Sequence, residues 1–431
     1  MQSYQNENNE FVTKLIRKRF LGSYKGTPFP YSEVFNNLEL IIDKKCNLGC
    51  KYCYYDKFAD QYFNNESLKK ESILQNAKEV ATWLKGAKLT PKLTLFSGDI
   101  LYRDIGIELI EIFSEYTQTG GFLTLPTNGT FLMDDAKTEE IGSIIKDKNI
   151  SISLSVEGLH CEHSRPLKGK QKDNRDEKYY DTAFKFAKEY NTGFHPMVHS
   201  SNIRSWKKNF MWFLEMYIKH DIPLNRLYLL EVRNNDWTKE DLQVFSNFIE
   251  FMIEKTFRHI CNSDRDVFID FIFKQRGFNI LSNNLISIVR GTGCSLQSTL
   301  CIRLGDMTIV PCHRLAYKWF EMGKLKLPEV TITDSKKPEL ISAIYSAKVS
   351  NFPKCDYCMI KNICMGQCLG AQFEHSYDLF YPNEVVCALL HTKVRALIKG
   401  FKSIGVFDEI TNSVNYDKSL ALREADKLFN K

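Results

Sequence analysis

Several features that would place this chain in a common class are missing from its sequence. Its 431 residues contain no apolar run near the roughly 20 residues that a membrane-spanning helix needs, and the polar start MQSYQNENNE holds no apolar signal core. The net charge is only +6, with 58 Lys and Arg scattered among 52 Asp and Glu, so no basic surface for nucleic acid is indicated. Internal repeats and low-complexity tracts are also absent. We expect a cytoplasmic, globular protein of two or three domains that binds neither membranes nor nucleic acid.

Cysteine, in contrast, is plentiful and falls into two groups. The early group has three members within eight residues, Cys46-x3-Cys50-x2-Cys53. The late group has eight members: Cys294, Cys301, Cys312, Cys355, Cys358, Cys364, Cys368 and Cys387. Only Cys161 and Cys261 stand outside these groups, and we expect both to be structural, because free cysteine is commonly a small buried hydrophobe. In a reducing cytoplasm this grouping favours metal ligation over disulfides, and the numbers predict one cluster with three protein ligands and two with four.

Apolar patterns predict an α/β protein in which strands alternate with helices. The predicted strands are Leu38–Ile42, Leu93–Phe96, Phe122–Leu125, Ile150–Val156, Gly193–Val198 and Leu227–Val232. Apolar residues recur at spacings of three and four in the predicted helices, which include Asn76–Leu84, Ile107–Tyr116, Asp181–Tyr190, Trp206–Ile218 and Lys239–Lys255. This order indicates parallel strands joined by right-handed crossovers, in a barrel or an open sheet. Ligands of such sheets gather at the carboxyl ends of the strands, and the early cysteine group directly follows the first strand.

The alternation ends near residue 285 and divides the chain. We expect an N-terminal appendage at 1–37, the strand-and-helix domain at 38–285, a cysteine-rich domain at 286–395 and a helical segment at 396–431. Residues 291–390 are rich in loops and poor in periodic apolar residues, so we expect bound metal to order them.

The early cysteine group has the chemistry of an incomplete cluster site. Three thiolates hold three irons of a cubane and leave the fourth iron open to a small molecule. A zinc site that lacks one ligand, or three loop cysteines without metal, is the alternative. With Tyr52 before the third cysteine, the spacing resembles the signature of the radical SAM family. The resemblance implies a partial (β/α)6 TIM-like barrel whose open iron chelates S-adenosylmethionine (SAM), and a 5′-deoxyadenosyl radical that abstracts hydrogen from the substrate.

The resemblance also implies a SAM-binding role for residues at the second and third strand ends. Ser97, Gly98 and Asp99 stand where the family carries Gly-Gly-Glu, so Asp99 would replace the glutamate that holds the methionyl amino group. Thr127 and Asn128 end the third strand, as in many relatives. The alternative is that Gly98 and the glycine after Asn128 are simply turn residues.

Residues at the later strand ends extend the match. Ser153, Ser155 and Arg165, with the intervening Glu157 and Gly158, resemble the family's Ser-x-Asp-Gly…Arg segment. By resemblance, Ser155 would contact the ribose or the carboxylate of SAM, and Arg165 the carboxylate. Leu229 and Leu230 would pack near the adenine. As alternatives, Arg165 is a surface cation and Ser153 an ordinary strand residue.

The late cysteine group resembles the SPASM extension, which follows a radical SAM barrel and carries two auxiliary 4Fe–4S clusters. The resemblance assigns Cys294, Cys301, Cys312 and Cys368 to the first cluster, and Cys355, Cys358, Cys364 and Cys387 to the second. A structural zinc ribbon is the alternative. Met307 stands where the family usually has a glycine before the cysteine that matches Cys312. With all eight thiolates bound, neither cluster has an open iron, so we expect both to accept electrons and not to bind substrate.

Enzymes with this pair of domains mostly modify peptides or proteins. The segments Phe194–Ser200, Leu229–Thr238 and Pro311–Tyr317 look like those of peptide maturases that form a cysteine thioether in a ribosomally made precursor peptide. Anaerobic sulfatase-maturing enzymes, which make formylglycine, carry an aspartate base after the cysteine that matches Cys312, whereas this chain has His313. His313 is then the candidate base for the thiol, or else a histidine that is hydrogen-bonded near a cluster.

Further alternatives concern the product, the class and the partners. Carbon–carbon cyclisation or epimerisation of a peptide is a second product, and a non-catalytic zinc- or cluster-binding protein is a second class. Glu231, Arg233 and Asn234 are candidates to contact the peptide, and the alternative is that Glu231 and Arg233 pair with each other. The implied partners are a precursor peptide and a flavodoxin- or ferredoxin-type reductant. Residues 1–37 are too short for a winged-helix module that binds the leader peptide, so another surface, an exposed strand edge or a separate leader-binding protein is expected to do so.

Overall fold

The fold is built around one large mixed sheet. The structure is a computed structural model that describes residues 2–21, 35–58, 69–146, 148–169, 175–287, 292 and 295–430. Nine strands form a sheet in the order β11-β10-β9-β8-β1-β2-β3-β4-β5, and β6 pairs with β7 separately. The strands of the N-terminal part are β1 (Asn37–Ile41), β2 (Lys92–Phe96), β3 (Phe122–Thr127), β4 (Ile150–Leu154), β5 (Gly193–Phe194), β6 (Met197–Val198) and β7 (Leu230–Glu231).

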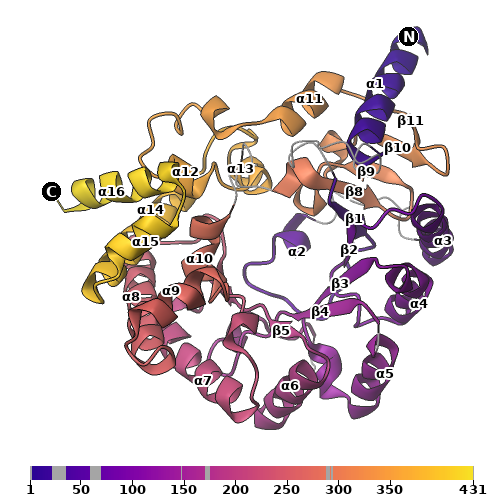
Figure 1. The fold of residues 1–431 in the computed structure, drawn as a ribbon. Coiled ribbons are helices and arrows are strands. Elements are labelled where there is room, and N and C mark those ends of the chain that lie inside the picture. Colours follow the sequence, from indigo (N-terminus) through magenta and orange to yellow (C-terminus); the bar gives the residue numbers. More distant parts are fainter. Residues whose placement is uncertain are drawn as a thin grey trace.

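The N-terminal part is a curved parallel sheet with helices on its outside. All neighbours from β1 to β5 are parallel, and a parallel bridge between Phe194 and Leu227 continues the pairing toward β7. The helices α3, α4, α5, α6, α7 and α8 surround the strands in Figure 1, as in a TIM-like barrel. Their bounds are α3 (Lys70–Gly86), α4 (Asp104–Gln118), α5 (Asp135–Ile145), α6 (Glu177–Glu189), α7 (Trp206–Lys219) and α8 (Lys239–Lys255). The predicted α/β class with a TIM-like barrel is confirmed.

Apolar spacing explains why these segments fold as they do. Along β1, Leu38 and Leu40 are fully buried against the helices, whereas Glu39 between them faces the other side of the sheet and is only partly buried. Along α4, Leu109, Ile110 and Phe113 recur at three- and four-residue spacings and are completely buried. The same periodicities carried the prediction, so every predicted strand and helix of this part has a counterpart.

The cysteine-rich part continues the barrel sheet. The strand β8 (Thr299–Arg303) pairs in parallel with β1, and β9 (Thr308–Val310), β10 (Gly323–Lys326) and β11 (Thr331–Thr333) follow in antiparallel order. Short helices complete it: α11 (Pro338–Ser346), α12 (Lys361–Cys364) and α13 (Leu369–Ser376). The backbone hydrogen bonds of one sheet therefore join the regions on either side of residue 285.

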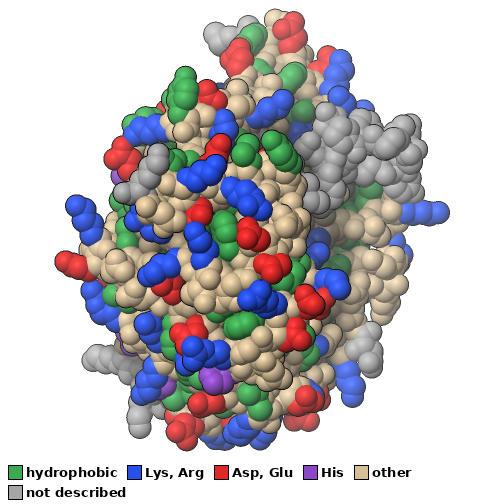
Figure 2. All heavy atoms as spheres, turned by 60° about the vertical axis from the view of Figure 1, so that its left-hand side comes forward, with side chains coloured by type: hydrophobic (Ala, Val, Ile, Leu, Met, Phe, Trp, Pro, Cys, Tyr) green, Lys and Arg blue, Asp and Glu red, His purple; other side chains and the backbone are tan. Residues whose placement is uncertain are grey.

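The C-terminal helices close the barrel on the side of α8. They are α14 (Glu384–Ser403), α15 (Phe407–Ser413) and α16 (Tyr416–Phe429), and α9 (Arg265–Phe273) and α10 (Asn279–Ile286) lie between them and the strands (Figure 1). The helix α14 packs along α8, and a Cβ added at Gly400 would lie only 2.5 Å from Ile253. The predicted division after residue 395 falls within α14. On this side of the molecule, cationic and anionic side chains are interspersed (Figure 2), and none of the described helices is long and apolar enough to cross a bilayer.

An N-terminal helix that the sequence did not predict covers the free edge of β11. This helix, α1 (Gln2–Leu21), packs along β11 and presents a polar residue every fourth position. The Thr13 hydroxyl accepts a bond from the Ile332 amide at 2.9 Å, and the Asn9 side chain accepts one from the Ser335 amide at 2.7 Å. Arg17 donates to the Val330 carbonyl at 3.1 Å. Side chains of α1 thus satisfy an edge that would otherwise offer free backbone groups to another strand.

Removing these side chains should loosen the edge of β11 without disturbing the barrel. In the variant Asn9→Ala/Thr13→Ala/Arg17→Ala, each lost hydrogen bond lowers the local opening free energy by about 1 kcal/mol, so the amides of Ile332 and Ser335 should exchange roughly fivefold faster. Hydrogen-exchange mass spectrometry of residues 328–336 measures this. The control Glu10→Ala/Lys14→Ala removes a solvent-exposed ion pair on the same helix and should change nothing in that peptide. Equal exchange in both variants would contradict the edge-capping role.

Candidate active site

The loop that carries the early cysteines leaves the end of β1 and rests on the end of β2. The amide of Gly98 donates to the Asp43 carbonyl at 3.1 Å, and the amide of Asp99 donates to the Lys45 carbonyl at 2.9 Å. A Cβ at Gly98 would lie 2.4 Å from the Lys45 carbonyl oxygen, so only glycine allows this approach. The Ser97 hydroxyl adds a bond to the Asp43 carboxylate at 3.2 Å. These contacts fix the backbone immediately before Cys46.

The three early thiols are half-buried and lie among hydrogen-bond donors. The Cys46 sulfur accepts from the Leu48 amide at 3.4 Å and from the Asn128 side chain at 3.6 Å, and the Cys53 sulfur accepts from the Asp56 amide at 3.3 Å. Burial raises the pKa of all three thiols, that of Cys53 to about 12. Buried thiols become thiolates when a metal cation supplies compensating charge, so this donor set suits an iron cluster.

Arg165 joins the ends of β3 and β4 next to Cys50. Its guanidinium is 1% exposed and donates to the Ser155 carbonyl and, at 3.1 Å, to the Asn128 carbonyl. Glu162 lies 3.2 Å away and neutralises it. Burial raises the pKa of the Cys50 thiol, and the adjacent Arg165 counters part of that rise. Arg165 is therefore a buried organiser of the site and not a surface cation.

Asp99 ties the end of β2 to the end of β3. Its buried carboxylate accepts from the Thr127 hydroxyl at 3.0 Å and from the Asn128 amide at 2.5 Å. The amides of Leu101 and Tyr102 each add a bond at 3.0 Å. Both carboxylate oxygens thus have protein partners in this structure, and the role of Asp99 toward a methionyl amino group stays a prediction.

A tyrosine–glutamate contact lies near Cys50. The Tyr52 hydroxyl donates to the Glu157 carboxylate, whose second oxygen accepts from the Met197 amide at 2.9 Å. Burial raises the pKa of Glu157 to about 8. The Tyr52 ring also lies 5.4 Å from the ring of His199, a buried residue to which the sequence had assigned no role. Tyr52 and Glu157 come from different strand ends, so the predicted signature residues converge.

Two of the remaining residues predicted to bind SAM, Ser153 and Leu230, lie on strands. Ser153 is on β4 and pairs with Gly193 of β5. Leu230 is on β7 opposite Met197, and the preceding Leu229 is fully buried. Their assigned contacts with SAM stay predictions.

His313 contacts a partner that the sequence did not reveal. Its Nδ1 lies 2.8 Å from the Glu39 carboxylate, which also accepts from the His313 amide at 3.2 Å. The ring stacks on Phe96 with centroids 4.3 Å apart. Burial acts to raise the pKa of Glu39, but the adjacent His313 outweighs it and holds that pKa below its usual range. Glu39 on β1 therefore fixes the imidazole of His313, the residue that directly follows Cys312.

The structure brings together the four cysteines of the second predicted set, whereas the first set stays a prediction. One cavity of about 30 Å³ is lined by all four cysteines of the second set, Cys355, Cys358, Cys364 and Cys387. Cys301 lies on β8 and interacts electrostatically with Cys312, whereas Cys368 precedes α13; the predicted ligand Cys294 lies outside the described residues. None of the twelve described cysteines forms a disulfide bond. Within the described ranges, no three His, Cys, Asp or Glu side chains are placed to share one metal ion, whereas a cubane distributes its ligands over separate irons.

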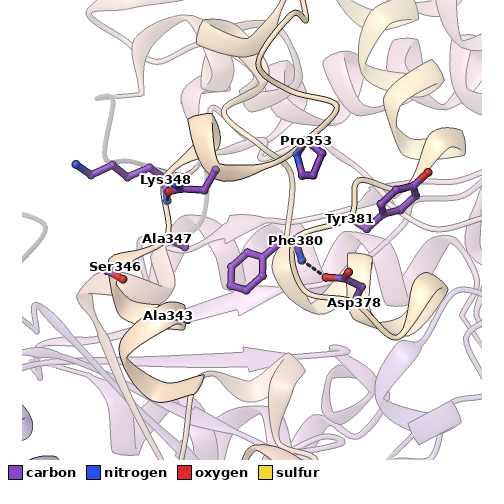
Figure 3. Close-up of a pocket in the computed structure, with 9 residues that line it drawn as sticks. Ala343, Ser346, Ala347, Lys348, Pro353, Asp378, Phe380 and Tyr381 are labelled. Carbon is purple, nitrogen blue, oxygen red and sulfur yellow. Dashed lines mark hydrogen bonds between the residues drawn. The ribbon is translucent and has the colours of Figure 1, made fainter. Parts of the chain in front are cut away.

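A larger cavity of about 620 Å³ opens on the surface of the cysteine-rich part, and Figure 3 shows the Phe380 ring among its walls. The Phe380 amide donates to the Asp378 carboxylate at 2.8 Å. The residues that line it are Ala343, Ser346, Ala347, Lys348, Asn351, Pro353, Asp378, Phe380 and Tyr381. No residue predicted to act in catalysis or ligation is among them.

A buried charged triad joins the end of β7 to α14. Glu231 is 4% exposed and accepts from Arg233 at 3.0 Å and from Lys393 at 3.1 Å. Lys393 also donates to Asn284 at 3.1 Å. Burial on its own raises the pKa of Glu231, but Lys393 and Arg233 outweigh it and lower the pKa to about 2. Glu231 and Arg233 therefore pair with each other, which was one of the two predicted alternatives.

The comparisons agree with this geometry. Residues 40–213, which contain the early cysteines and the strand ends around them, match the radical SAM superfamily. This part of the chain is a radical SAM domain, and the protein is a radical SAM enzyme. Membership implies SAM and a 4Fe–4S cluster, and the residues around Cys46, Cys50 and Cys53 fit that pair.

Solved structures with a similar fold include three of SuiB from Streptococcus suis, each 14% identical in sequence. SuiB bound to S-adenosylmethionine has a TM-score of 0.50, with 86% of this chain and 80% of that chain covered. SuiB alone has a TM-score of 0.47 over 81% and 76%, and SuiB bound to the precursor peptide SuiA one of 0.46 over 88% and 79%. Among curated proteins, none matches the chain significantly. The likeness to SuiB with SAM concerns the fold.

Gly98→Ala should prevent the early cysteines from holding iron. The new methyl group meets the Lys45 carbonyl at 2.4 Å, so the loop that leads into Cys46 must move. After anaerobic reconstitution, iron per chain should fall by about one cubane, and iron analysis measures it. Gly86→Ala is the matched control, because a Cβ at the end of α3 meets nothing within 4 Å. Iron content in Gly98→Ala equal to that of the control would refute the proposed support of the loop.

Breaking the buried triad should cost far more than breaking a surface pair on the same helix. Glu231→Gln leaves Lys393 and Arg233 without their counter-charge, so the free energy of unfolding should fall by about 3–5 kcal/mol. Lys399→Met on α14, which breaks the exposed pair with Glu250 of α8, should cost at most about 1 kcal/mol. The double variant Glu231→Gln/Lys393→Met should lose less free energy of unfolding than the single variants Glu231→Gln and Lys393→Met lose together. Denaturant unfolding measures these free energies. Similar losses in Glu231→Gln and Lys399→Met would show that the triad does not stabilise the fold.

Proposed function

We propose that the enzyme is a peptide maturase that cross-links a ribosomally made precursor peptide, by joining a cysteine sulfur to a carbon as a thioether. One observation carries the proposal: four cysteines surround a cavity in a region that shares a sheet with the radical SAM barrel. This arrangement supports auxiliary iron–sulfur clusters at the second set of late cysteines, and by extension at the first set. A barrel that generates a radical, joined to clusters that accept electrons, is suited to the oxidative formation of a bond.

The formation of a thioether requires both the radical-generating barrel and the electron-accepting clusters. A carbon–hydrogen bond without an activating group does not yield to acids or bases, whereas SAM bound at a cluster held by the early cysteines supplies a carbon radical that removes the hydrogen atom. Bond formation between the substrate thiolate and the resulting carbon radical releases one electron. That electron needs an acceptor, and the thiol needs a base. The peptide as a whole loses two hydrogens.

The residues of the chain have separate tasks in this scheme. Cys46, Cys50 and Cys53 would hold the cluster, with Arg165 placing a positive charge beside Cys50. His313 is the proposed acceptor of the thiol proton through Nε2, because Nδ1 contacts Glu39.

The proposed partners follow from the proposed reaction. The precursor peptide is the substrate class that the sequence segments indicate, and SuiB, which has a similar fold, is described with a precursor peptide as well as with SAM. A flavodoxin- or ferredoxin-type protein would supply the reducing electron. A separate leader-binding protein would capture the leader peptide.

The test uses the reconstituted full-length protein with SAM, dithionite and the short cysteine-containing peptides encoded beside its gene. We expect a peptide product that has lost two hydrogens and whose cysteine no longer reacts with iodoacetamide. Tandem mass spectrometry locates the linkage. Cys46→Ala should abolish the product, whereas Cys261→Ala, which removes a cysteine outside both groups, should retain it.

Other products have distinct signatures. An aldehyde on cysteine or serine would replace the proposal with formylglycine synthesis. Loss of two hydrogens with the cysteine still reactive would indicate a carbon–carbon link, and an unchanged mass with solvent deuterium incorporated would indicate epimerisation. Product formation by Cys46→Ala would refute radical chemistry at the early cysteines.

A further inference from the structure

The amide side chain of Gln367 points at the sulfur of Cys387. Gln367 is 2% exposed, and its Nε2 lies 3.2 Å from the Asn383 carbonyl and 2.9 Å from the Cys387 sulfur. A carbonyl oxygen only accepts hydrogen bonds, so the contact with Asn383 requires the nitrogen of the amide to be on this side. The same NH2 group therefore presents its second hydrogen to Cys387.

The backbone of the same loop points at a second sulfur of the set. Met365, Gly366 and Gln367 all have positive φ angles, of 57°, 87° and 64°. The amides of Gly366 and Gln367 donate to the Cys364 sulfur. Successive backbone N–H groups that converge in this way form a concave anion-binding nest, a feature of many iron–sulfur sites. Two left-handed residues other than glycine are costly, and strain of this kind persists where the surroundings enforce it.

A third sulfur has a side-chain contact as well. The Nε2 of His391 on α14 lies 3.5 Å from the Cys358 sulfur. Cys358, Cys364 and Cys387 thus each have a nitrogen neighbour, and all three line the cysteine cavity with Gln367 and His391.

The surroundings of Cys301 in the other set are different. Its thiol lies against the Glu39 carboxylate, with which it shares a hydrogen bond, and the two residues are opposite each other in the β1–β8 register. A carboxylate opposes the addition of negative charge to a neighbouring group, whereas N–H donors favour it.

We propose that the Gln367 amide and the nest at Cys364 make the cluster of Cys355, Cys358, Cys364 and Cys387 the auxiliary centre of higher reduction potential, and so the final acceptor of the substrate electron inside the protein. The inference rests on the proposed function, which assigns the auxiliary clusters. A reduced cluster carries one more negative charge than the oxidised one. Hydrogen bonds to its sulfurs stabilise the reduced form and raise the potential. An electron released at the substrate then moves toward this set.

The test compares two buried glutamines. Gln367→Met removes the donor to sulfur together with one amide–carbonyl bond. Gln372→Met is the control, because the Gln372 amide is equally buried and donates to the Gly366 carbonyl at 2.7 Å but does not contact a sulfur. Both are made in the full-length chain with Cys46, Cys50 and Cys53 replaced by Ala, so that only auxiliary clusters contribute, and midpoint potentials are measured by EPR-monitored titration.

In Gln367→Met the higher of the two midpoint potentials should fall while the other stays unchanged, and Gln372→Met should leave both unchanged. The inference is overturned if neither potential moves in Gln367→Met, if the lower one moves, or if the control shifts equally. Should Gln367→Met lose iron, the unaltered chain with side-chain ¹⁵N-labelled glutamine decides. Nitrogen coupling to the higher-potential cluster in pulsed EPR supports the inference, and its absence overturns it.

Iron analysis separates this inference from the proposed function. If the starting chain binds no auxiliary iron, the proposed function fails together with its clusters. If two auxiliary cubanes are present and Gln367→Met changes neither midpoint potential, only the assigned role of Gln367 fails.

Discussion

The parallel pairing of β1 with β8 holds the radical SAM barrel and the cysteine-rich part in one sheet. The carboxyl end of β1 leads into the early cysteines, and β8 carries Cys301 in register with Glu39. The backbone hydrogen bonds of this pair therefore set the position of the radical-generating loop relative to the cysteine-rich region. The bond between Glu39 and His313 adds a side-chain connection across the same junction. Without this pairing, the two cysteine groups would belong to separately moving parts.

Buried charges at the strand ends hold the site in one arrangement. Arg165 uses the carbonyls at the ends of β3 and β4, and Asp99 uses the amides and hydroxyl at the ends of β2 and β3. Glu231 joins β7 to α14 by accepting a hydrogen bond from Lys393. Because each charge is neutralised or fully hydrogen-bonded, its burial is tolerated, and removing any single partner leaves a costly uncompensated group. Rigidity of this kind suits an enzyme that must keep a reactive radical away from its own side chains.

The sequence predicted those features that local spacing encodes. Alternation of period two and of period 3.6 gave the barrel strands and helices, and the cysteine spacing gave both groups. The resemblance to the SPASM extension gave the set of four residues that line one cavity. Polar contacts between residues that are far apart in the chain could not be predicted from the sequence. Glu39 and His313 are 274 residues apart, and Gln367 meets Cys387 across a helix start, so no local pattern marks either pair. The helix α1 was missed because its contacts with β11 are polar and leave a weak apolar stripe.

Radical chemistry in this enzyme requires that the early cysteines hold a cluster with one iron open to SAM. Electron–nuclear double resonance on the reduced protein tests it directly, with SAM labelled by ¹⁷O in the carboxylate and by ¹⁵N in the amino group. We expect hyperfine coupling of both nuclei to one cluster, lost when Cys46, Cys50 and Cys53 are replaced by Ala and retained when the second set of late cysteines is replaced. The absence of coupling in the unaltered protein, or coupling that depends on the late cysteines, would contradict it.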